Sequence, residues 1–428
     1  MCESLEPFDE IDRRAFAVHM AKACFGVGMI PLLGTGTQVF GQQGKGGKAK
    51  KAIYLFMSGG MTHLDTFDPK PGAETQGSTK AIKTSVSGVQ LSEHFPKLAE
   101  RMNKLSIVRS MTTTQGAHAQ GRYLAHTSYP PRATVRHAAM GAWVAKVKGQ
   151  INKNVPANVV INGGSDHPGA GYMDLKYAPL PIGDPTAGLQ NSKLLGGVSE
   201  QDFNRRLNLV AKFGNQFLAR YPFKEVEGYG AMYAEAIRLM QSEDVKAFDV
   251  AQEDSKLRDT YGRGNFGQGC LLARRLLERD VRFVEVQLGG WDTHVDNFET
   301  LAEKGPEVDT AVAALLDDLE RTGLLSETVV VLTSEFGRSP KINERVGRDH
   351  HPAAYSSLIA GAGIKAGYVH GASDDRGHFV DDDEVPVEDF NATIAQALGI
   401  PVDQIEYSAS KRPFKIANDG VPVDKLFA

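Results

Sequence analysis

An unbroken run of apolar, mostly β-branched residues constrains the fold more than any other part of the chain. The run spans residues 328–333 and leads into a small polar residue, Glu335 and a glycine. Such a run is typical of a strand that is buried on both faces, as in a parallel sheet with helices on either side. Open sheets of this kind bind ligands beyond the carboxyl ends of their strands. The sequence therefore predicts a functional site near Glu335.

Residues that bind metals or transfer protons follow two predicted strands. An Asp-His-His triplet that includes His350 comes shortly after the run, and Asp292 and His294 follow an apolar segment at residues 281–288. In an extended chain, residues two apart point to the same side, so Asp292 and His294 are expected to face one site. With His350 they supply two imidazoles and one carboxylate, a workable ligand set for zinc or another divalent ion. The alternative is a hydrogen-bonded structural network beside Trp291.

The order of the predicted elements favours a three-layer α/β/α sandwich with a mostly parallel sheet. Strands and helices alternate along the chain, which is typical of a parallel sheet with helices on both faces. Besides the run itself, strands are predicted at residues 52–57, 105–108, 158–161, 281–288, 358–361 and 368–369. Helices are predicted at residues 91–102, after Gly121, within 200–280, at 307–325 and at 387–398, with mostly loop at residues 162–200.

Composition excludes several classes of protein. The chain has 428 residues, 41% of them hydrophobic, and a formal net charge of −4. It can therefore bury a large core, and it offers no electrostatic reason to bind nucleic acid. Its three cysteines are too few for a disulfide framework or a cysteine-rich zinc site. The sequence gives no indication of an oligomeric state.

Residues 1–40 are typical of an export segment rather than of a folded domain. Arg13 and Arg14 precede a moderately apolar run rich in Gly and Ala, as in a twin-arginine signal, and the alternative is an amphipathic N-terminal helix. The run is too short and too interrupted for a stable membrane span. Residues 41–51 are typical of a flexible linker. We therefore expect an exported protein, periplasmic or extracellular, whose folded domain comprises residues 52–428.

Four blocks of sequence together resemble the DUF1501 family. They are the predicted strand and loop at residues 53–71, Gly-Trp-Asp-Thr-His at 290–294, Ser-Glu-Phe-Gly-Arg at 334–338 and Gly-Arg-Asp-His-His-Pro at 347–352. The resemblance extends from the paired arginines to the last predicted helix, and it implies an exported bacterial protein. The family is in turn similar to the alkaline phosphatase and sulfatase superfamily, which implies an alkaline phosphatase-like fold for residues 52–428.

The resemblance also implies roles for individual residues. Residues 116–122 fit the nucleophile block of sulfatases, with His118 at the nucleophile position and Arg122 at the arginine position. Ser58 stands where the superfamily has its first metal-binding Asp, and Phe336 stands where it has a His, so a one-metal site is implied. The ion is expected to be zinc, calcium or manganese. The predicted ligands are Asp65, Asp292, His294 and His350.

The predicted chemistry leaves alternatives open. Glu335 is expected to be a ligand or a general base, or else to form a structural ion pair with Arg338 or Arg348. His118 is expected to act as an acid or base, a ligand or a nucleophile, at a helix start that favours an oxyanion. His126, His137 and His167 show no partner in the sequence and are expected in the core or on the surface.

The function hypothesis is an exported, metal-dependent hydrolase of phosphate or sulfate esters. Its candidate substrates are small-molecule esters and esters on polysaccharide. The alternative is a non-catalytic exported binding or scaffold protein on a degenerate hydrolase fold, which the changes at Ser58 and Phe336 favour. The hydrolase hypothesis requires the predicted ligands, Glu335 and His118 to converge at the carboxyl ends of the parallel strands.

Overall fold

The described part of the chain is built around strand β1 (Lys51–Met57), which is buried along its whole length. The computed structural model describes residues 47–190, 192 and 196–428. The predicted export segment at residues 1–40 and residues 41–46 of the predicted linker lie outside these residues. The end of the predicted linker is corrected, because Ala49 and Lys51 are buried and β1 already begins at Lys51. From residue 47 onward, the described residues belong to one compact unit.

Strand β1 separates two hydrophobic cores because successive side chains of a strand point to opposite faces. Ile53, Leu55 and Met57 belong to one core, whereas Tyr54 and Phe56 belong to the other. A strand with apolar residues on both faces needs a layer of helices on each side. The continuous apolar run of β1 thus requires three layers.

The main sheet is parallel except for one strand. Strand β11 runs antiparallel to both of its neighbours, and every other pair in this sheet is parallel. The prediction of a mostly parallel sheet is therefore confirmed. The strand order is β12 (Tyr368–His370), β4 (Leu105–Thr112), β11 (Tyr355–Gly361), β8 (Thr328–Thr333), β1, β7 (Phe283–Leu288), β5 (Asn158–Ile161) and β6 (Leu180–Ile182), with β15 (Val385–Pro386) also paired to β4.

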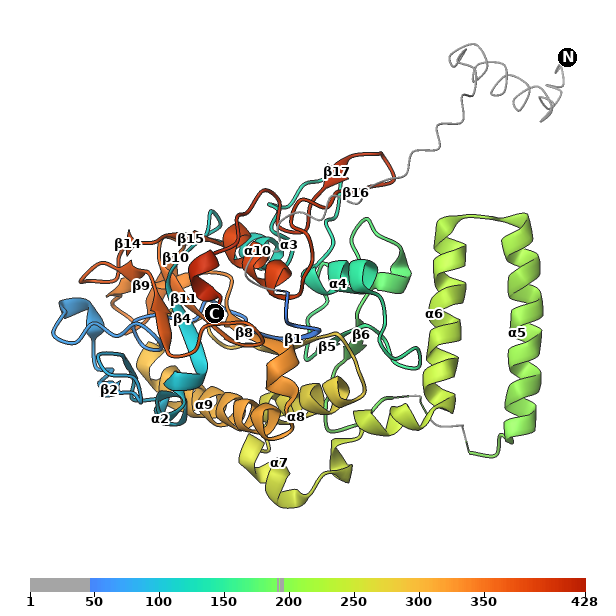
Figure 1. The fold of residues 1–428 in the computed structure, drawn as a ribbon, viewed down its shortest axis with the longest axis horizontal. Helices are drawn as coiled ribbons and strands as arrows, with labels where there is room; N and C mark the ends of the chain where they lie inside the picture. Colours follow the sequence, from blue (N-terminus) through green and yellow to red (C-terminus); the bar gives the residue numbers. More distant parts are fainter. Residues whose placement is uncertain (1–46, 191, 193–195) are drawn as a thin grey trace, which may run out of the picture. The chain divides into compact units, whose positions relative to one another are not determined.

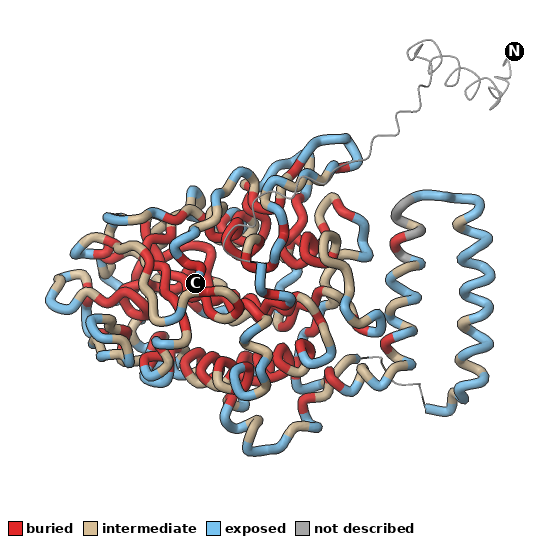
Figure 2. The backbone as a smooth tube through the Cα atoms, viewed as in Figure 1, coloured by how far each residue is buried: buried red, intermediate tan, exposed pale blue. Residues whose placement is uncertain are grey.

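Helices cover both faces of this sheet (Figure 1). The core that contains Leu55 is closed by α2 (Pro96–Glu100), α8 (Asn265–Glu278) and α9 (Asn297–Arg321). The core that contains Phe56 is closed by α3 (His118–Thr127), α4 (Met140–Lys148) and α10 (Val387–Ala397). Figure 2 shows the buried residues concentrated in these layers. The predicted α/β/α sandwich is the observed architecture.

Further elements extend from the sandwich. Three more helices are α5 (Glu200–Arg220), α6 (Lys224–Gln241) and α7 (Ser255–Tyr261). Two-stranded pairs are formed by β2 (Ala81–Lys83) with β3 (Gln90–Ser92), β9 (Gly337–Ile342) with β10 (Arg348–His351), β13 (Ala372–Ser373) with β14 (Val380–Asp382), and β16 (Glu406–Tyr407) with β17 (Pro413–Phe414). Short 3₁₀ helices lie at Glu74–Gln76, Met102–Lys104, Leu175–Tyr177, Glu243–Phe248, Val250–Gln252, Leu324–Glu327 and Asp424–Leu426. Within the described residues, no helix is long and apolar enough to cross a membrane.

Two predicted helices have different bounds in the structure, and proline is involved in both cases. The helix predicted at residues 91–102 is wrong in its first part, because β3 occupies that segment and α2 begins only at Pro96. Proline fits the first turn of a helix, where its missing N–H leaves no bond unmade. The helix predicted to begin at residue 307 begins at Asn297 instead, so Pro306 lies inside α9. Tertiary packing thus keeps the helix continuous through a proline, which removes one backbone hydrogen bond from its interior.

Three parallel strands end side by side at one edge of the sheet. The N–H of Gly59, just after β1, donates to Glu335 Oε1, just after β8, at 2.9 Å. The N–H of Trp291, after β7, donates to the carbonyl of Ser58 at 3.4 Å. The carboxyl ends of β1, β7 and β8 therefore bring residues from three distant parts of the sequence into contact, as the open-sheet rule predicts.

Truncation of Leu55 tests the central position of β1. Leu55 is fully buried between two paired strands, so we expect Leu55→Ala to lower the free energy of unfolding by about 2–5 kcal/mol. Leu175→Ala is the matched control, because Leu175 is 46% exposed and its truncation should change stability by less than about 1 kcal/mol. Urea denaturation followed by circular dichroism measures both, and equal effects would contradict this description of the core.

Candidate functional site

The site is assembled around Glu335, a fully buried carboxylate directly after β8. One oxygen, Oε1, accepts the Gly59 N–H at 2.9 Å and lies 2.8 Å from Nδ1 of His118. The other oxygen accepts the hydroxyl of Ser334 at 3.1 Å. A buried carboxylate requires such donors. Glu335 therefore pairs with His118, and neither Arg338 nor Arg348 takes up its charge by an ion pair in the described structure.

His118 is the first residue of α3 and connects Glu335 to Asp292. Its Nδ1 donates to Glu335, because a carboxylate can only accept, and its Nε2 lies 3.2 Å from Asp292 Oδ2. The hydrogen bond to Glu335 raises the pKa of His118 against the opposing effect of burial, and the charge of Asp292 raises it further. His118 is thus oriented by one carboxylate and directs its other nitrogen to a second.

Two more histidines present Nε2 lone pairs to Asp292. His350, on β10, has its Nδ1 2.7 Å from the carbonyl of Gly116, and His294 has its Nδ1 2.7 Å from Asp349 Oδ1. Each Nδ1 faces an acceptor and must carry the proton, so each neutral ring leaves a lone pair on Nε2. Metal-binding histidines usually make this kind of second hydrogen bond.

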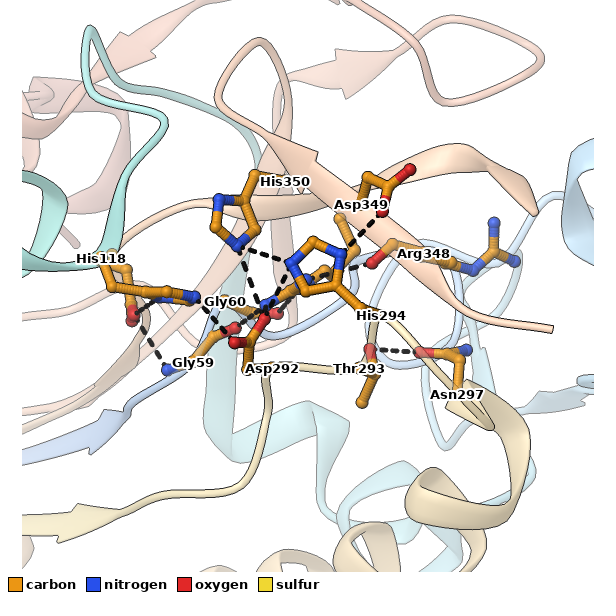
Figure 3. Close-up of polar contacts among 12 residues, drawn as sticks. Gly59, Gly60, His118, Asp292, Thr293, His294, Asn297, Arg348, Asp349 and His350 are labelled. Atoms are coloured by element: carbon orange, nitrogen blue, oxygen red, sulfur yellow. Dashed lines mark hydrogen bonds and ion pairs between the residues drawn. The ribbon is translucent and has the colours of Figure 1, made fainter. Parts of the chain in front are cut away.

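These lone pairs meet at one point (Figure 3). Nε2 of His294 lies 3.0 Å from Nε2 of His350, and Asp292 Oδ1 lies 3.2 Å from the first nitrogen and 3.4 Å from the second. Three acceptors at these separations repel one another unless a cation lies between them. A proton can bridge one pair of acceptors, whereas a divalent ion can bind all three.

Arg338 positions the carboxylate of Asp292. Its guanidinium is fully buried and donates to Asp292 Oδ1, to the carbonyls of Gly59 and Gly60, and to the carbonyl of Arg348. Partial burial raises the pKa of Asp292, but Arg338 and then His118 outweigh it and lower the value to about 2. Burial lowers the pKa of His350. Both groups are therefore in the protonation state that binds a metal at neutral pH.

The loop after β1 approaches the backbone of Asp292 closely because Gly59 has no side chain. Gly59 has a φ of +125°, and a β-carbon there would lie 2.5 Å from the backbone nitrogen of Asp292. Only glycine adopts this conformation without strain and leaves that space free. The Ser-Gly-Gly sequence after β1 thus allows the segments that follow β1 and β7 to pack closely against each other.

Arg122 lies one helical turn after His118 and extends the site. It donates to Ser58 Oγ at 3.3 Å and pairs with Asp166 at 2.8 Å. The preceding residue at the start of α3, Ala117, provides no side-chain hydrogen bond to the helix. The first N–H groups of a helix attract anions. An arginine and a helix start therefore lie together beside the cluster of acceptors.

The structure gives Asp65 a different place from the one that the sequence predicted. Asp65 is fully buried, and its two oxygens accept hydrogen bonds from four side chains. These donors are Thr62, Thr79, Asn297 and Arg348. A carboxylate that already has four donors has no free lone pair directed at the cluster. The prediction of Asp65 as a metal ligand is therefore replaced by a structural role as the buried partner of Arg348.

A second buried network, which the sequence analysis missed, lies behind Arg122. Glu285 on β7 accepts from His126 at 2.8 Å and from His167 at 3.2 Å. His126 also donates through Nδ1 to the carbonyl of Arg122 at 2.7 Å. His118, Arg122 and His126 are spaced by four residues and share one face of α3. That spacing was the signal available in the sequence.

In this second network each contact between a histidine and Glu285 is bridged by a proton, so the network does not suit a metal ion. His167 Nδ1 accepts the N–H of Gly169 at 3.0 Å, so the ring proton must lie on Nε2, directed at Glu285. Both nitrogens of His126 face acceptors, which makes its ring an imidazolium. The ligand atoms of His126, His167 and Glu285 lie close enough together to hold an ion. The tautomers of the two histidines, however, leave no lone pair that could bind it.

The sequence and structure can now be compared with those of known proteins. A family model described as "Protein of unknown function (DUF1501)" matches residues 49–427. The chain belongs to the DUF1501 family. A comparison with curated proteins finds no match.

Solved structures similar to this DUF1501 protein include enzymes of sulfate and phosphate chemistry. The PsFucS1 sulfatase from Pseudoalteromonas sp. is 13% identical, with 99% of this chain and 76% of that chain covered and a TM-score of 0.42. A protein of the alkaline phosphatase superfamily from Vibrio parahaemolyticus is 13% identical, with 90% and 72% covered and a TM-score of 0.39. An alkaline phosphatase from the Antarctic bacterium TAB5 is 13% identical, with 77% and 96% covered and a TM-score of 0.33.

Six of the seven predicted site residues lie together in the structure. Five of them form one continuous set of contacts, Arg122 lies beside them through its contact with Ser58, and Asp65 is the exception. Their functional roles stay predictions. The six are His118, Arg122, Asp292, His294, Glu335 and His350.

Replacement of Glu285 by Gln tests the network behind Arg122. Burial opposes the charge of Glu285, but His126 and His167 hold its pKa well below the usual range. Burial likewise opposes the charge of His126, yet Glu285 raises its pKa. Removing one partner of such a buried pair costs about 3 kcal/mol. We expect Glu285→Gln to lower the free energy of unfolding by this amount near pH 6.

The effect should depend on pH in both directions. A depressed carboxylate pKa stabilises the fold above the unfolded value of about 4.3, and this contribution is lost as the pH falls. A raised histidine pKa stabilises below the unfolded value of about 6.5, and this contribution is lost as the pH rises through the folded value. The difference between the native protein and Glu285→Gln should therefore peak between about pH 4.5 and 6.5. Glu303→Gln, at an exposed position on α9, should show no such peak in the same denaturation series.

Proposed function

We propose that this protein is an exported, metal-dependent hydrolase of phosphate or sulfate esters. The observation that carries the proposal is the convergence of three lone pairs, from His294, His350 and Asp292, at separations of 3.0–3.4 Å. In a tetrahedral zinc site with bonds of about 2.0–2.1 Å, neighbouring donors lie about 3.3 Å apart. The donor triangle therefore has the size of one face of a zinc coordination shell.

The donor chemistry favours zinc or manganese over calcium. Two imidazoles and one carboxylate suit zinc and related ions, whereas calcium prefers oxygen ligands alone. The hydrogen bonds from His350 to Gly116 and from His294 to Asp349 fix both rings in the required orientation. A divalent ion held by these residues would polarise an ester oxygen and activate water.

His118 and Glu335 provide the acid–base pair of the proposal. Glu335 fixes the tautomer and orientation of the imidazole, in the way that a carboxylate orients the histidine of a hydrolytic triad. The hydrogen bond to Glu335 and the charge of Asp292 raise the pKa of His118 against the effect of burial, which favours its protonated form. Its Nε2–H can therefore protonate the leaving oxygen of an ester. A quarter of the His118 side chain is exposed, whereas Nε2 itself is buried beside Asp292.

Arg122 and the start of α3 account for an anionic substrate. Phosphate and sulfate esters carry negative oxygens, which a guanidinium and free helix N–H groups bind. Arg122 keeps about a third of its side chain exposed while it contacts Ser58 and Asp166. The serine that replaces an acidic residue after β1 is thus used to position this arginine.

Export is the remaining part of the proposal. It is based on the twin arginines at residues 13 and 14 and the run that follows them. Secretion of the full chain through the twin-arginine route, lost on Arg13→Lys together with Arg14→Lys, would support it.

The metal prediction is tested by metal content and thermal stability. We expect the purified protein to bind about one equivalent of zinc or manganese, and chelation to lower its Tm, because a ligand bound to the native state stabilises the fold. His294→Gln with His350→Gln should abolish both effects. His94→Gln is the matched control, since His94 lies beside α9 at Gly305. Less than about half an equivalent in the native protein would contradict a metal site.

The acid–base prediction is tested with aryl phosphates and aryl sulfates. His118→Gln should lower kcat about 10²–10⁴-fold while metal content is retained, because loss of a general acid affects turnover rather than ligation. Arg122→Gln should chiefly raise KM. If metal content and turnover are both absent, the protein is a non-catalytic binding or scaffold protein. If metal is bound and His118→Gln has native turnover, the role given to His118 is wrong.

A further inference from the structure

Helix α5 carries large apolar side chains that no other described part of the chain covers. None of its residues is buried. Figure 1 shows it beside α6 on the side away from the sheet, and Figure 2 shows its surface exposed along almost the whole helix. We call the exposed apolar residues in and just after this helix the α5 patch. They are Leu209 (49% exposed), Val210 (47%), Phe213 (62%), Phe217 (53%), Tyr221 (39%) and Phe223 (59%).

The α5 patch is continuous along one side of the helix. Leu209, Phe213 and Phe217 are spaced by four residues, so their side chains follow one another along one face. The ring of Phe217 lies 4.8 Å from that of Tyr221, and the ring of Tyr221 lies 6.5 Å from that of Phe223. Apolar side chains scattered singly over a surface need no explanation, whereas a contiguous aromatic patch marks an interaction site.

All charged residues within the segment that carries the patch are cations, whereas Glu200 and Asp202 precede it in the first turn of α5. Residues 204–223 contain Arg205, Arg206, Lys212 and Arg220 and no acidic residue, in a chain whose net charge is −4. Arg205 pairs with Asp202 at 2.7 Å. The other three cations have no ion pair with any described residue. Arg206 and Arg220 lie seven residues, or about two helical turns, before and after Phe213. The helix therefore presents uncompensated positive charge together with exposed aromatic rings.

We propose that the α5 patch binds the surface of an anionic lipid bilayer, with α5 lying in the plane of the interface. Phe and Leu side chains enter the boundary between headgroups and acyl chains, Tyr221 lies at headgroup level, and the arginines contact lipid phosphates. A second copy of this chain is disfavoured as the partner, because two such helices oppose their positive charges. This inference is independent of the metal site.

Vesicle sedimentation with the full-length protein tests the proposal. The protein should bind vesicles of equal parts phosphatidylcholine and phosphatidylglycerol, and should bind pure phosphatidylcholine at least about tenfold more weakly. Phe213→Ser with Phe217→Ser should weaken binding to the anionic vesicles by at least about tenfold. Arg206→Gln with Arg220→Gln should weaken it about thirtyfold and reduce its sensitivity to salt.

Phe379→Ser is the matched control, since Phe379 is 64% exposed and lies outside α5. It should bind vesicles as the native protein does, and circular dichroism should show all variants folded. The proposal is overturned if the native protein ignores anionic vesicles or if Phe213→Ser with Phe217→Ser binds them unchanged. It is also overturned if the native protein is a dimer that this double variant converts to monomer, because the patch would then be an interface between copies.

Discussion

The guanidinium of Arg338 is the group on which the arrangement of the site depends. It is fully buried and donates hydrogen bonds to three backbone carbonyls and to one carboxylate. Those acceptors belong to the loop after β1, the segment after β7 and strand β10. Burial lowers the pKa of Arg338, yet an arginine stays charged in a protein. One buried charge thus keeps three segments of backbone in contact, and among residues 47–190, 192 and 196–428 its only anionic acceptor is Asp292.

Two groups of side chains use the same residue types for different purposes. One is formed by Asp292, His294 and His350, and the other is the network of Glu285, His126 and His167. In the network around Glu285, every carboxylate lone pair that faces a histidine meets a proton, and the result is a closed, buried structure. Around Asp292, the second nitrogen of each imidazole is occupied by a backbone or side-chain acceptor, so the lone pairs face one another. The hydrogen bonds on the far side of each ring, rather than the identity of the ring, distinguish a candidate ligand from a structural histidine.

The fold could be predicted from the sequence more completely than the site. The apolar run at residues 328–333 required a strand with helices on both sides, and β8 has that environment. The side chains after strand ends were correctly expected to meet, because their position depends only on strand direction. Asp65 differs, since its sequence neighbourhood did not reveal Arg348, which is 283 residues away and forms its buried partner. The helical spacing of His126 from His118 and Arg122 was present in the sequence but was not used, and its partner Glu285 lies inside an apolar strand, where the sequence gives no sign of a buried ion pair.

The single reversed strand of the sheet limits how the site can move. Strand β8 ends at the edge where the site lies, and β11, which pairs with β8, begins at that same edge because it runs antiparallel. The segment between them, residues 334–354, carries Glu335, Arg338 and His350 and is fixed at both stems to adjacent strands. Motions that close a site over a substrate require a hinge at the base of the moving segment. Here Glu335 and Arg338 are fully buried and hydrogen-bonded to the loop after β1, so a motion of this segment would have to break those bonds, whereas the facing loops can adjust without breaking them.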